Sequence, residues 1–555
     1  NHAILTPESL HNPTKESLLR AAKKLLDHFG PDNVSIALFH HFRRGEEKTN
    51  RLLRDLGGFL KIPIIASNSP TYSQRSDRLL ADAFTCLREH KTLDDSGRFL
   101  ECNGERFLKS PKEIHNLFIT HPQVANNAQA LSEECSDFSL ENLGYRFPSY
   151  RDPNTGKLFT GHEQCEYLRH TVERGLKKKF LNLSKKHRQQ IDQELITIEK
   201  LGFSGYFLIV WDLVRFARSQ GILCQGRGSA ANSLVCYAIG VTSVDPVESG
   251  LLFERFLSEN RQSWPDIDID FPSGDRREAV IQYVFQKYAP RGAAMTANVI
   301  TYKPRSAFRE MSKILGFPES IADRFTDLCA SPKVHDASRE PASDELSMSN
   351  YYPGDKVVEL AGTIERSGIP PSHPRFEPLL KLYHAVLHCP RHLGQHSGGM
   401  VFCDDGLDQV VPLQPAAMEN RTVLQWDKDD CEDLGIVKVD LLGLGMLAAM
   451  EDALKICERR GRPVNLAKIP KNDPATYDLL CRADTVGTFQ VESRAQMATL
   501  PIMQPRCFYD LAVEVAIIRP GPIVGDLVHP YLNRRTKREQ IEYIHPDFEP
   551  ILKRT

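Results

Sequence analysis

The stretch WPDIDIDF, residues 264–271, carries the most informative pattern of this sequence. Asp266, Asp268 and Asp270 alternate there with isoleucine and phenylalanine. Because the side chains of an extended strand alternate between two faces, we expect the three carboxylates on one face and the apolar side chains in a core. Aspartate is uncommon in strands, and like charges on one face repel each other. The pattern therefore predicts a strand whose acidic face needs a compensating charge.

A divalent cation is the natural compensating charge for such a face. Mg²⁺ takes carboxylate oxygens in octahedral geometry and leaves positions open for water and substrate phosphate. Two such ions about 4 Å apart can activate an attacking oxygen and stabilise a leaving oxygen, as in nucleotidyl transfer. A solvent-facing edge strand is the alternative. A calcium loop is disfavoured, because the segment lacks the turn glycine and the closing glutamate of that loop.

A further acid for this site is predicted at Asp440, inside the apolar run LGIVKVDLLGLGML of residues 434–447. One acid in an apolar strand is costly unless it is paired or bound to a metal. Lys438 lies two residues earlier and is expected on the same face, so a buried salt bridge is the alternative. We expect Asp440 to complete a metal site with the acids of the first strand.

A glycine-rich segment, ILCQGRGSAANSLVCYAIG of residues 222–240, precedes the acidic strand. We expect Gly226 and Gly228 to let the backbone bend towards a ligand, and Ser229 and Asn232 to cap the following helix. Free N–H groups at a helix start suit a phosphate. The segment lacks the lysine of a Walker loop and the third glycine of a dinucleotide fingerprint, so a plain turn is the alternative.

Basic residues accompany these motifs. Arg255 stands just before the acidic strand, and Lys303, Arg305 and Arg309 fall at a predicted helix start, where they could bind phosphates, bind a DNA strand or simply face solvent. A predicted helical segment is also strongly basic, and either phosphate binding or a solvated helix face explains it. Its cations are Arg174, Lys177, Lys178, Lys179, Lys185, Lys186 and Arg188.

Composition bounds the class of protein. A chain of 555 residues is long enough for three or four domains. The net charge of −2 argues against a globally basic DNA-binding protein, so any nucleic-acid surface must be local. No apolar run is long enough for a membrane span, and thirteen scattered cysteines without C-x-x-C favour a reducing cytoplasm over a disulfide framework. The start at Asn1 and the abrupt end suggest a fragment.

Local patterns indicate the organisation of the chain. Helical spacing over 15–29 and a β-branched run at 62–67 predict an α/β N-terminal part. The Pro- and Gly-rich stretch 147–158 predicts an exposed connection, with a domain boundary between 140 and 155. The stretch of low hydrophobicity between Pro332 and Pro374, with ASREPASDELSMSN at 337–350, predicts a flexible insertion on a domain edge.

Together these motifs resemble, over about residues 60–545, the alpha subunit of bacterial DNA polymerase III, a C-family DNA polymerase. The resemblance is closest to the error-prone branch, the inducible-mutagenesis polymerases known as ImuC, because of GRGSAANS, KPRSAFRE and QVESRAQM. The stretches that carry it are GYFLIVWDLVRFARSQGILCQGRGSAANS (205–233), LLFERF (251–256), PDIDIDF (265–271), RREAVIQYV (276–284), TYKPRSAFRE (301–310), CPRHLGQHSGGMVF (389–402), VLQWDKDDCEDLGIVKVDLLGLGML (423–447), GTFQVESRAQM (487–497) and MQPRCFYDLAVEVAIIRPGPIVGD (503–526).

The resemblance implies a multidomain α/β architecture. Its palm would have the polymerase beta-like nucleotidyltransferase fold, with a helical thumb and fingers, preceded by part of a PHP (polymerase and histidinol phosphatase) domain. Ser69 and Thr71 stand where metal-binding PHP domains place Asp and His, so this domain is expected to be structural. The implied boundaries are 1–140 for the PHP-like part, 141–297 and 396–445 for the palm, 298–395 for the thumb, and 446–555 for the beginning of the fingers.

The resemblance also implies an activity. The chain would belong to an error-prone DNA-directed DNA polymerase that adds deoxynucleotides to a primer 3′ end by two-metal transfer, in damage-induced mutagenesis and translesion synthesis. A replicative alpha subunit and a non-catalytic assembly protein at damaged DNA are the alternatives. Partners would be primer–template DNA, deoxynucleoside triphosphates, the sliding clamp and mutasome accessory proteins, with no membrane.

The family motifs assign roles to individual residues. Asp266, Asp268 and Asp440 would be the catalytic ligands of two Mg²⁺ ions, for which Mn²⁺ can substitute, and Asp270 a neighbour that binds no metal. The triphosphate would be bound by Gly226, Gly228, Ser229, Arg255 and Lys438. On this resemblance we expect the chain to stop inside the fingers, before the family's clamp motif and single-strand-binding fold.

Overall fold

The structure is a computed structural model that describes residues 2–6, 14–152, 155–258, 264–329, 354–404, 406–466, 469–470, 472–518 and 528–552. The chain divides into two compact units, each made from two chain segments. The first unit is Asn1–Pro148 with Tyr288–Lys438, and the second is Ser149–Lys287 with Val439–Thr555. Both units combine helices with strands, so the predicted α/β class is confirmed.

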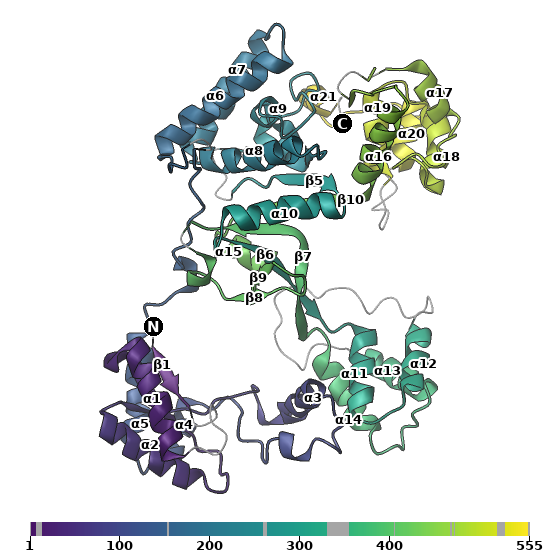
Figure 1. The fold of residues 1–555 in the computed structure, drawn as a ribbon. Helices are drawn as coiled ribbons and strands as arrows, with labels where there is room; N and C mark the ends of the chain where they lie inside the picture. Colours follow the sequence, from purple (N-terminus) through teal and green to yellow (C-terminus); the bar gives the residue numbers. More distant parts are fainter. Residues whose placement is uncertain are drawn as a thin grey trace. The chain divides into compact units, whose positions relative to one another are not determined.

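The first unit begins with a sheet of three parallel strands in the order β1-β2-β3. The central strand is buried along its whole length, and α1, α2 and α5 pack against the strands (Figure 1). The predicted helix over 15–29 is confirmed, with Thr14 as its cap. The elements are β1 (Ala3–Leu5), α1 (Lys15–Phe29), β2 (Val34–Leu38), α2 (Glu46–Leu60), β3 (Ile64–Ala66), α4 (Pro111–Leu117) and α5 (Pro122–Glu134).

A helical cluster follows in the same unit and has its own apolar core. Phe308 and Phe325 stack there with ring centroids 3.7 Å apart. A helix from the N-terminal segment also packs into this cluster, because Ala83 and Cys86 are buried in the same core. The helices are α3 (Arg78–Arg88), α11 (Pro304–Ile314), α12 (Glu319–Cys329), α13 (Gly354–Arg366) and α14 (Phe376–Val386). The helix start predicted near Lys303 is confirmed, since Lys303 is the residue before α11.

The remaining strands of the first unit pair in the order β7-β6-β9-β8. The β6–β7 pair is antiparallel and long, whereas β9 pairs with β6 in parallel and with β8 antiparallel. The elements are β6 (Ala293–Thr301), β7 (Pro390–Phe402), β8 (Leu413–Pro415), β9 (Thr422–Leu424) and α15 (Lys428–Asp433).

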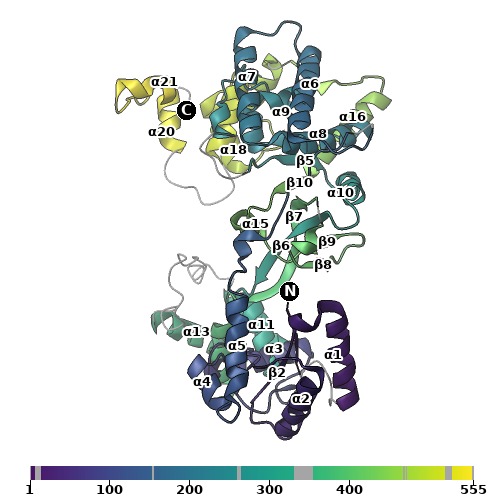
Figure 2. The ribbon, with the colours of Figure 1, turned by 90° about the vertical axis from the view of Figure 1, so that its left-hand side faces the viewer.

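The second unit is built around three strands and a helical layer. β5 pairs antiparallel with β4 and parallel with β10. Helix α6 packs on α8 and α9, and α7 also packs on α9, as both ribbon views show (Figures 1 and 2). The elements are α6 (Gly161–Lys179), α7 (Lys185–Lys200), α8 (Ser204–Ser219), β4 (Gln225–Arg227), α9 (Leu234–Ala238), β5 (Asp268–Pro272), α10 (Asp275–Lys287) and β10 (Lys438–Leu444).

The C-terminal segment of the second unit is helical. Its helices α17, α18 and α19 pack in sequence, around a small core that includes Tyr477 and Leu500. They are α16 (Gly445–Arg459), α17 (Pro474–Cys481), α18 (Arg494–Met503), α19 (Phe508–Ile517), α20 (Val528–Arg535) and α21 (Glu549–Leu552). Over the described ranges, no helix combines the length and the apolar character that crossing a bilayer requires.

The connection predicted at 147–158 differs from the expectation in one respect. Tyr150 is only 1% exposed, because its ring packs with those of Tyr167 and Trp211, so this part of the stretch is buried. Packing against these aromatic rings buries Tyr150, although the neighbouring residues of the stretch are polar.

Of the insertion predicted between Pro332 and Pro374, residues 332–353 lie outside the described residues. Residues 354–374 differ from the prediction, because they include α13, whose Ile364 is buried in the core of the helical cluster.

Candidate active site

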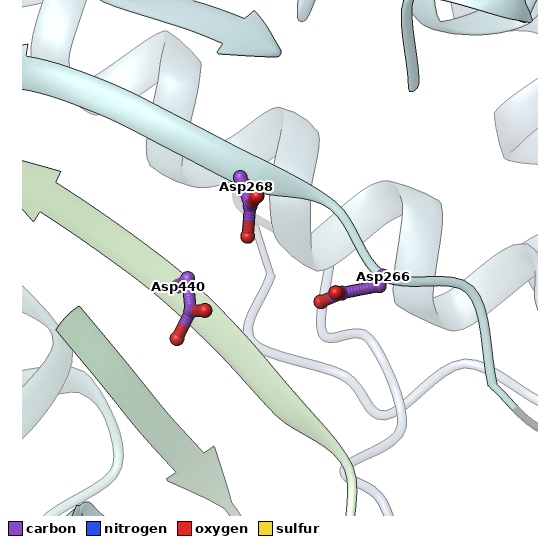
Figure 3. Close-up of side chains that lie close together, drawn as sticks. All are labelled: Asp266, Asp268 and Asp440. Atoms are coloured by element: carbon purple, nitrogen blue, oxygen red, sulfur yellow. The ribbon is translucent and has the colours of Figure 1, made fainter. Parts of the chain in front are cut away.

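Three aspartates converge in the second unit. In the parallel pairing of β5 with β10, Asp440 stands directly opposite Asp268. Asp266 lies two residues before β5, in the segment that leads into the strand. One carboxylate oxygen of each residue lies within 4.8 Å of the others, and Figure 3 shows the three side chains pointing towards one another. Like charges opposite each other on paired strands repel, so this arrangement calls for a cation.

Burial differs among the three acids. Asp440 is 9% exposed, whereas Asp266 is exposed to solvent. The site is therefore closed at β10 and open at Asp266, where a substrate could enter. Three carboxylates within reach of one atom match the oxygen-ligand preference of hard divalent cations, so this cluster could hold a metal ion. No second group of this kind occurs among the residues that the structure describes.

The backbone around the acids is held by side chains that the sequence did not point to. Tyr206 of α8 is buried, and its Oη accepts a hydrogen bond of 3.1 Å from the N–H of Ile267, between the two acids of the PDID motif. Arg277 of α10 donates from Nε to the carbonyl of Leu441, one residue after Asp440, at 2.7 Å. Tyr206 stands in an apolar helical run in the sequence, where nothing distinguishes it from a core residue.

Arg227 places a positive charge beside the acidic strand. β4 pairs antiparallel with β5 and places Arg227 opposite Asp268. Its Nε lies 3.7 Å from Asp268 Oδ2 and 3.6 Å from Asp270 Oδ1. Burial raises the pKa of Asp270, and the charge of Arg227 opposes this rise. In the sequence, only the position of Arg227 between two glycines hints at a role.

The expected strand face needs a correction. The alternation predicts Asp266 on the same strand as Asp268 and Asp270, but β5 begins only at Asp268, so Asp266 lies before the strand. Asp440 joins Asp266 and Asp268 in the cluster, and Asp270 lies outside it. The register of β10 decides this, because it brings Asp440 opposite Asp268.

The glycine-rich segment also differs from the prediction. Gly226 lies in β4, and a Cβ atom there would stand 2.8 Å from the carbonyl oxygen of Val241, so this glycine serves close packing. A 3-10 helix, η6 (Gly228–Asn232), follows, and Ser233 caps α9. The expected capping by Ser229 and Asn232 is therefore wrong. The helix that they were to cap starts only after a separate helical turn.

Gly228 and Ser229 do lie beside the acids. Gly228 has a φ of +67°, which side chains disfavour, and the place of its missing Cβ is 3.9 Å from Asp268 Oδ2. The Ser229 hydroxyl donates to the carbonyl of Asp266 at 3.3 Å. The turn and the first acids thus form one local structure.

The two remaining residues expected to bind nucleotide lie on η7 and β10. Arg255 is exposed at the end of the 3-10 helix η7 (Phe253–Arg255), which contacts η6. Lys438 is the first residue of β10, two residues before Asp440, and its Cδ lies 3.0 Å from the place of a Cβ on Gly399.

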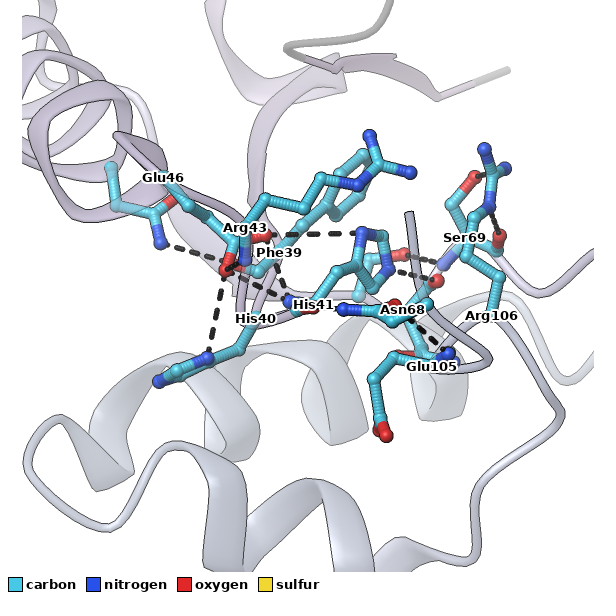
Figure 4. A network of polar contacts seen from close by, with 12 residues as sticks. Phe39, His40, His41, Arg43, Glu46, Asn68, Ser69, Glu105 and Arg106 are labelled. Atoms are coloured by element: carbon cyan, nitrogen blue, oxygen red, sulfur yellow. Dashed lines mark hydrogen bonds and ion pairs between the residues drawn. The ribbon is translucent and has the colours of Figure 1, made fainter. Parts of the chain in front are cut away.

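The N-terminal sheet carries a separate polar network (Figure 4). The guanidinium of Arg106 donates to the carbonyl and the hydroxyl oxygen of Ser69, each at 3.0 Å, and pairs with Glu101 at 3.1 Å. His41 is buried, and its Nε2 lies 2.8 Å from the carbonyl of Asn68. Burial lowers the pKa of His41, so the ring is neutral at pH 7. The guanidinium of Arg106 therefore lies directly against Ser69.

Comparison with known proteins agrees with the geometry. The family model for the bacterial DNA polymerase III alpha NTPase domain matches residues 166–443, and that for the finger domain of the same subunit matches residues 446–555. The first range contains the three clustered acids.

Curated relatives extend the match to almost the whole chain. The chain is 44% identical over 541 residues to the error-prone DNA polymerase of Mycobacterium tuberculosis strain H37Rv. The matched region covers 97% of this chain and 45% of the relative. It is 42% identical to the error-prone DNA polymerases of Cutibacterium acnes (96% of this chain, 44% of the relative) and of Pseudomonas aeruginosa (92% and 47%). The chain thus spans a little under half the length of these relatives. On the family matches and the extent of these similarities, the chain belongs to the bacterial DNA polymerase III alpha family.

Proposed function

We propose that this chain carries the nucleotidyl-transfer centre of an error-prone DNA-directed DNA polymerase. The observation that carries the proposal is the convergence of Asp268 and Asp440, from two paired strands, with Asp266, from the segment that leads into the first of them. The names of the relatives favour the error-prone branch, which acts in damage-induced mutagenesis and translesion synthesis, over a replicative alpha subunit. A non-catalytic assembly role remains the alternative of another class, and the same cluster argues against it.

In this proposal the three acids are the ligands of two Mg²⁺ ions, or of Mn²⁺ in their place. Bound ions would lower the pKa of the primer 3′ hydroxyl and neutralise charge on the leaving pyrophosphate. The 3′ oxygen forms a bond to the α-phosphorus of the deoxynucleotide, the bond to the β-phosphate breaks, and the hydroxyl proton passes to solvent. The chain's own part is to hold the acids in register, through Tyr206 and Arg277.

Binding of the triphosphate is proposed for the turn beside the acids. The backbone N–H groups of Gly228 and Ser229 would bind the phosphates, because these two residues lie beside Asp268 and Asp266, and Arg255 and Lys438 would add positive charge. Gly226 acts indirectly in this scheme, because it keeps β4 close to Val241.

The finer architecture is also part of the proposal. The strands that carry the acids would belong to a polymerase beta-like palm, within 141–297 and 396–445, with a thumb over 298–395 and the first part of the fingers over 446–555. Residues 1–140 would be a structural PHP-like part, which the Arg106–Ser69 contact supports. Primer–template DNA, deoxynucleotides, the sliding clamp and mutasome proteins are the proposed partners, and the cytoplasm the proposed location.

Primer extension by the full-length protein tests this function, on undamaged and abasic-site templates with Mg²⁺. We expect Asp268→Asn to lower extension at least about 100-fold, since even partners of metal ligands typically contribute 10- to 100-fold. Asp270→Asn is the matched control, because it removes a carboxylate from the same strand but outside the cluster.

The outcomes of this assay distinguish the three candidate functions. Extension past the lesion that depends on Asp268 but not on Asp270 supports the error-prone polymerase. Extension on undamaged DNA alone would favour the replicative alternative. A folded protein that extends neither template would move the assignment to the assembly role.

A further inference from the structure

The loop between α6 and α7 has an unusual concentration of positive charge. Residues 174–191 contain seven Lys and Arg residues and no Asp or Glu, in a chain whose net charge is −2. All seven are exposed, but Lys179 contacts the ring of Tyr237 and Arg188 pairs with Glu173. We call the other five the basic tip: Arg174, Lys177, Lys178, Lys185 and Lys186.

The basic tip is not neutralised by neighbouring acids. The nearest carboxylates are already engaged, because Glu173 pairs with Arg188, and Asp245 lies 3.1 Å from His187. Within the part of the chain that the structure describes, none of the five tip residues has a carboxylate within ion-pair distance. Their charges therefore face solvent and are available to a partner.

The positive charge of the basic tip is favourable at the end of α6 but unfavourable at the start of α7. Cations at the C-terminal end of α6 interact favourably with the helix dipole, but Lys185 and Lys186 occupy the first turn of α7, which contains no acid. Cations at this end of a helix are disfavoured, because the helix dipole places positive charge there. The stability of the free protein therefore does not explain why Lys185 and Lys186 stand in this turn, whereas binding of an anion would explain it.

The loop is also held in place in the absence of a partner. Lys179 Nζ lies 3.6 Å from the centroid of the Tyr237 ring, and the rings of Phe180 and His187 are 4.8 Å apart. Ser184 caps α7. The tip cations therefore project from an ordered platform, so a partner would not have to order the loop.

We propose that the basic tip binds the phosphate backbone of double-stranded DNA, as a contact surface in addition to the acidic cluster. The inference rests on the proposed function, which supplies DNA as the polyanion. Cations spread over two helix ends suit a row of phosphates. An anionic membrane suits the tip less well, because membrane-bound helices combine cations with a broad apolar face, and Leu181 is the one fully exposed apolar side chain of this loop.

The test compares DNA affinity and its salt dependence, with the full-length protein and a fluorescent primer–template duplex in an anisotropy assay. The variant replaces Lys177, Lys178, Lys185 and Lys186 by Gln. The matched control replaces Lys15, Lys23, Lys24 and Lys48 by Gln, four exposed lysines of α1 and α2. Both variants change the net charge by the same amount, and thermal melting checks that both stay folded.

We expect the tip variant to bind DNA at least about 10-fold more weakly at 0.15 M salt. The slope of log K against log salt should fall by about 3 to 4, since each phosphate contact contributes about 0.9. The control variant should keep the affinity and slope of the wild type. At saturating DNA the tip variant should still extend primers, because its acids are intact.

Two results would overturn the inference without touching the proposed function. One is an unchanged salt slope in the tip variant while the wild type extends primers. The other is binding to phosphatidylserine vesicles that depends on the tip while DNA affinity does not. Failure of the wild-type protein to bind or extend primer–template DNA would instead count against the proposed function itself.

Discussion

Glu194 of α7 is a fully buried carboxylate that fixes the start of a neighbouring helix. It accepts hydrogen bonds from the Ser233 hydroxyl at 2.8 Å and from the N–H groups of Leu234 and Val235, both at 2.9 Å. Ser233 follows the turn that carries Ser229. Glu194 thus anchors the far end of the segment that lies beside the acidic cluster.

Because Glu194 is buried, its contribution to the stability of the protein depends on pH. Burial raises its pKa to about 7, although its hydrogen bonds oppose the shift. Between about pH 4.5 and 7 the folded protein holds a proton that the unfolded chain has released, so the contribution of Glu194 to stability falls as pH rises through this window. It is fully present below pH 4.5 and lost above about pH 7.

We therefore expect the free energy of unfolding to depend less on pH in Glu194→Gln than in the wild type. The difference between the two proteins should change by about 3 kcal/mol from pH 4.5 to pH 7, because one pKa unit corresponds to about 1.4 kcal/mol. Urea denaturation at a series of pH values measures it. Parallel curves for the two proteins would show that Glu194 does not titrate in this window.

At the scale of elements, the approach of α6 to α9 depends on a glycine. A Cβ atom on Gly175 would stand 1.9 Å from the carbonyl oxygen of Ala238, closer than any real contact. The same helix contains Gly161 near its start, where a Cβ would meet no atom within 4 Å. The two glycines of one helix therefore have different reasons to be there.

This contrast predicts opposite effects of alanine. Gly175→Ala should lower the free energy of unfolding by about 1–3 kcal/mol, because the clash forces the helices apart. Gly161→Ala should leave stability unchanged or raise it by up to about 1 kcal/mol, because alanine loses less backbone entropy. Chemical denaturation of both variants measures this, and equal effects would contradict the packing argument.

At the scale of the molecule, the acidic cluster joins the two chain segments of the second unit. Asp266 and Asp268 come from Ser149–Lys287, and Asp440 comes from Val439–Thr555. A cation bound by all three would tie these segments together in the folded state and would have no such site in the unfolded chain.

Mg²⁺ or Mn²⁺ should therefore raise the melting temperature of the 555-residue chain. Ligand at 100 times its Kd stabilises a folded protein by about 2.7 kcal/mol. Differential scanning fluorimetry over a metal titration measures the shift, which EDTA should reverse. Asp268→Asn and Asp440→Asn should abolish the shift, whereas Asp270→Asn should keep it. A shift that survives in the first two variants would place the ion elsewhere.

Much of this protein follows from its sequence alone. The alternation of acids with apolar residues at 264–271, the isolated Asp440 and the helical spacing at 15–29 are local signals, and all of them are visible without a structure. Local patterns are reliable where an element's own residues decide its form. The family resemblance added the order of the motifs, and the family matches agree with it.

Contacts between distant segments decided the rest. The pairing of β10 with β5 put Asp440 opposite Asp268, and tertiary packing turned the expected turn at Gly226 into a strand and buried Tyr150. Tyr206 holds the acidic segment from another helix. The residues that meet in these contacts lie in different segments of the chain. Which of them meet is determined by the strand register and by the packing of the whole fold.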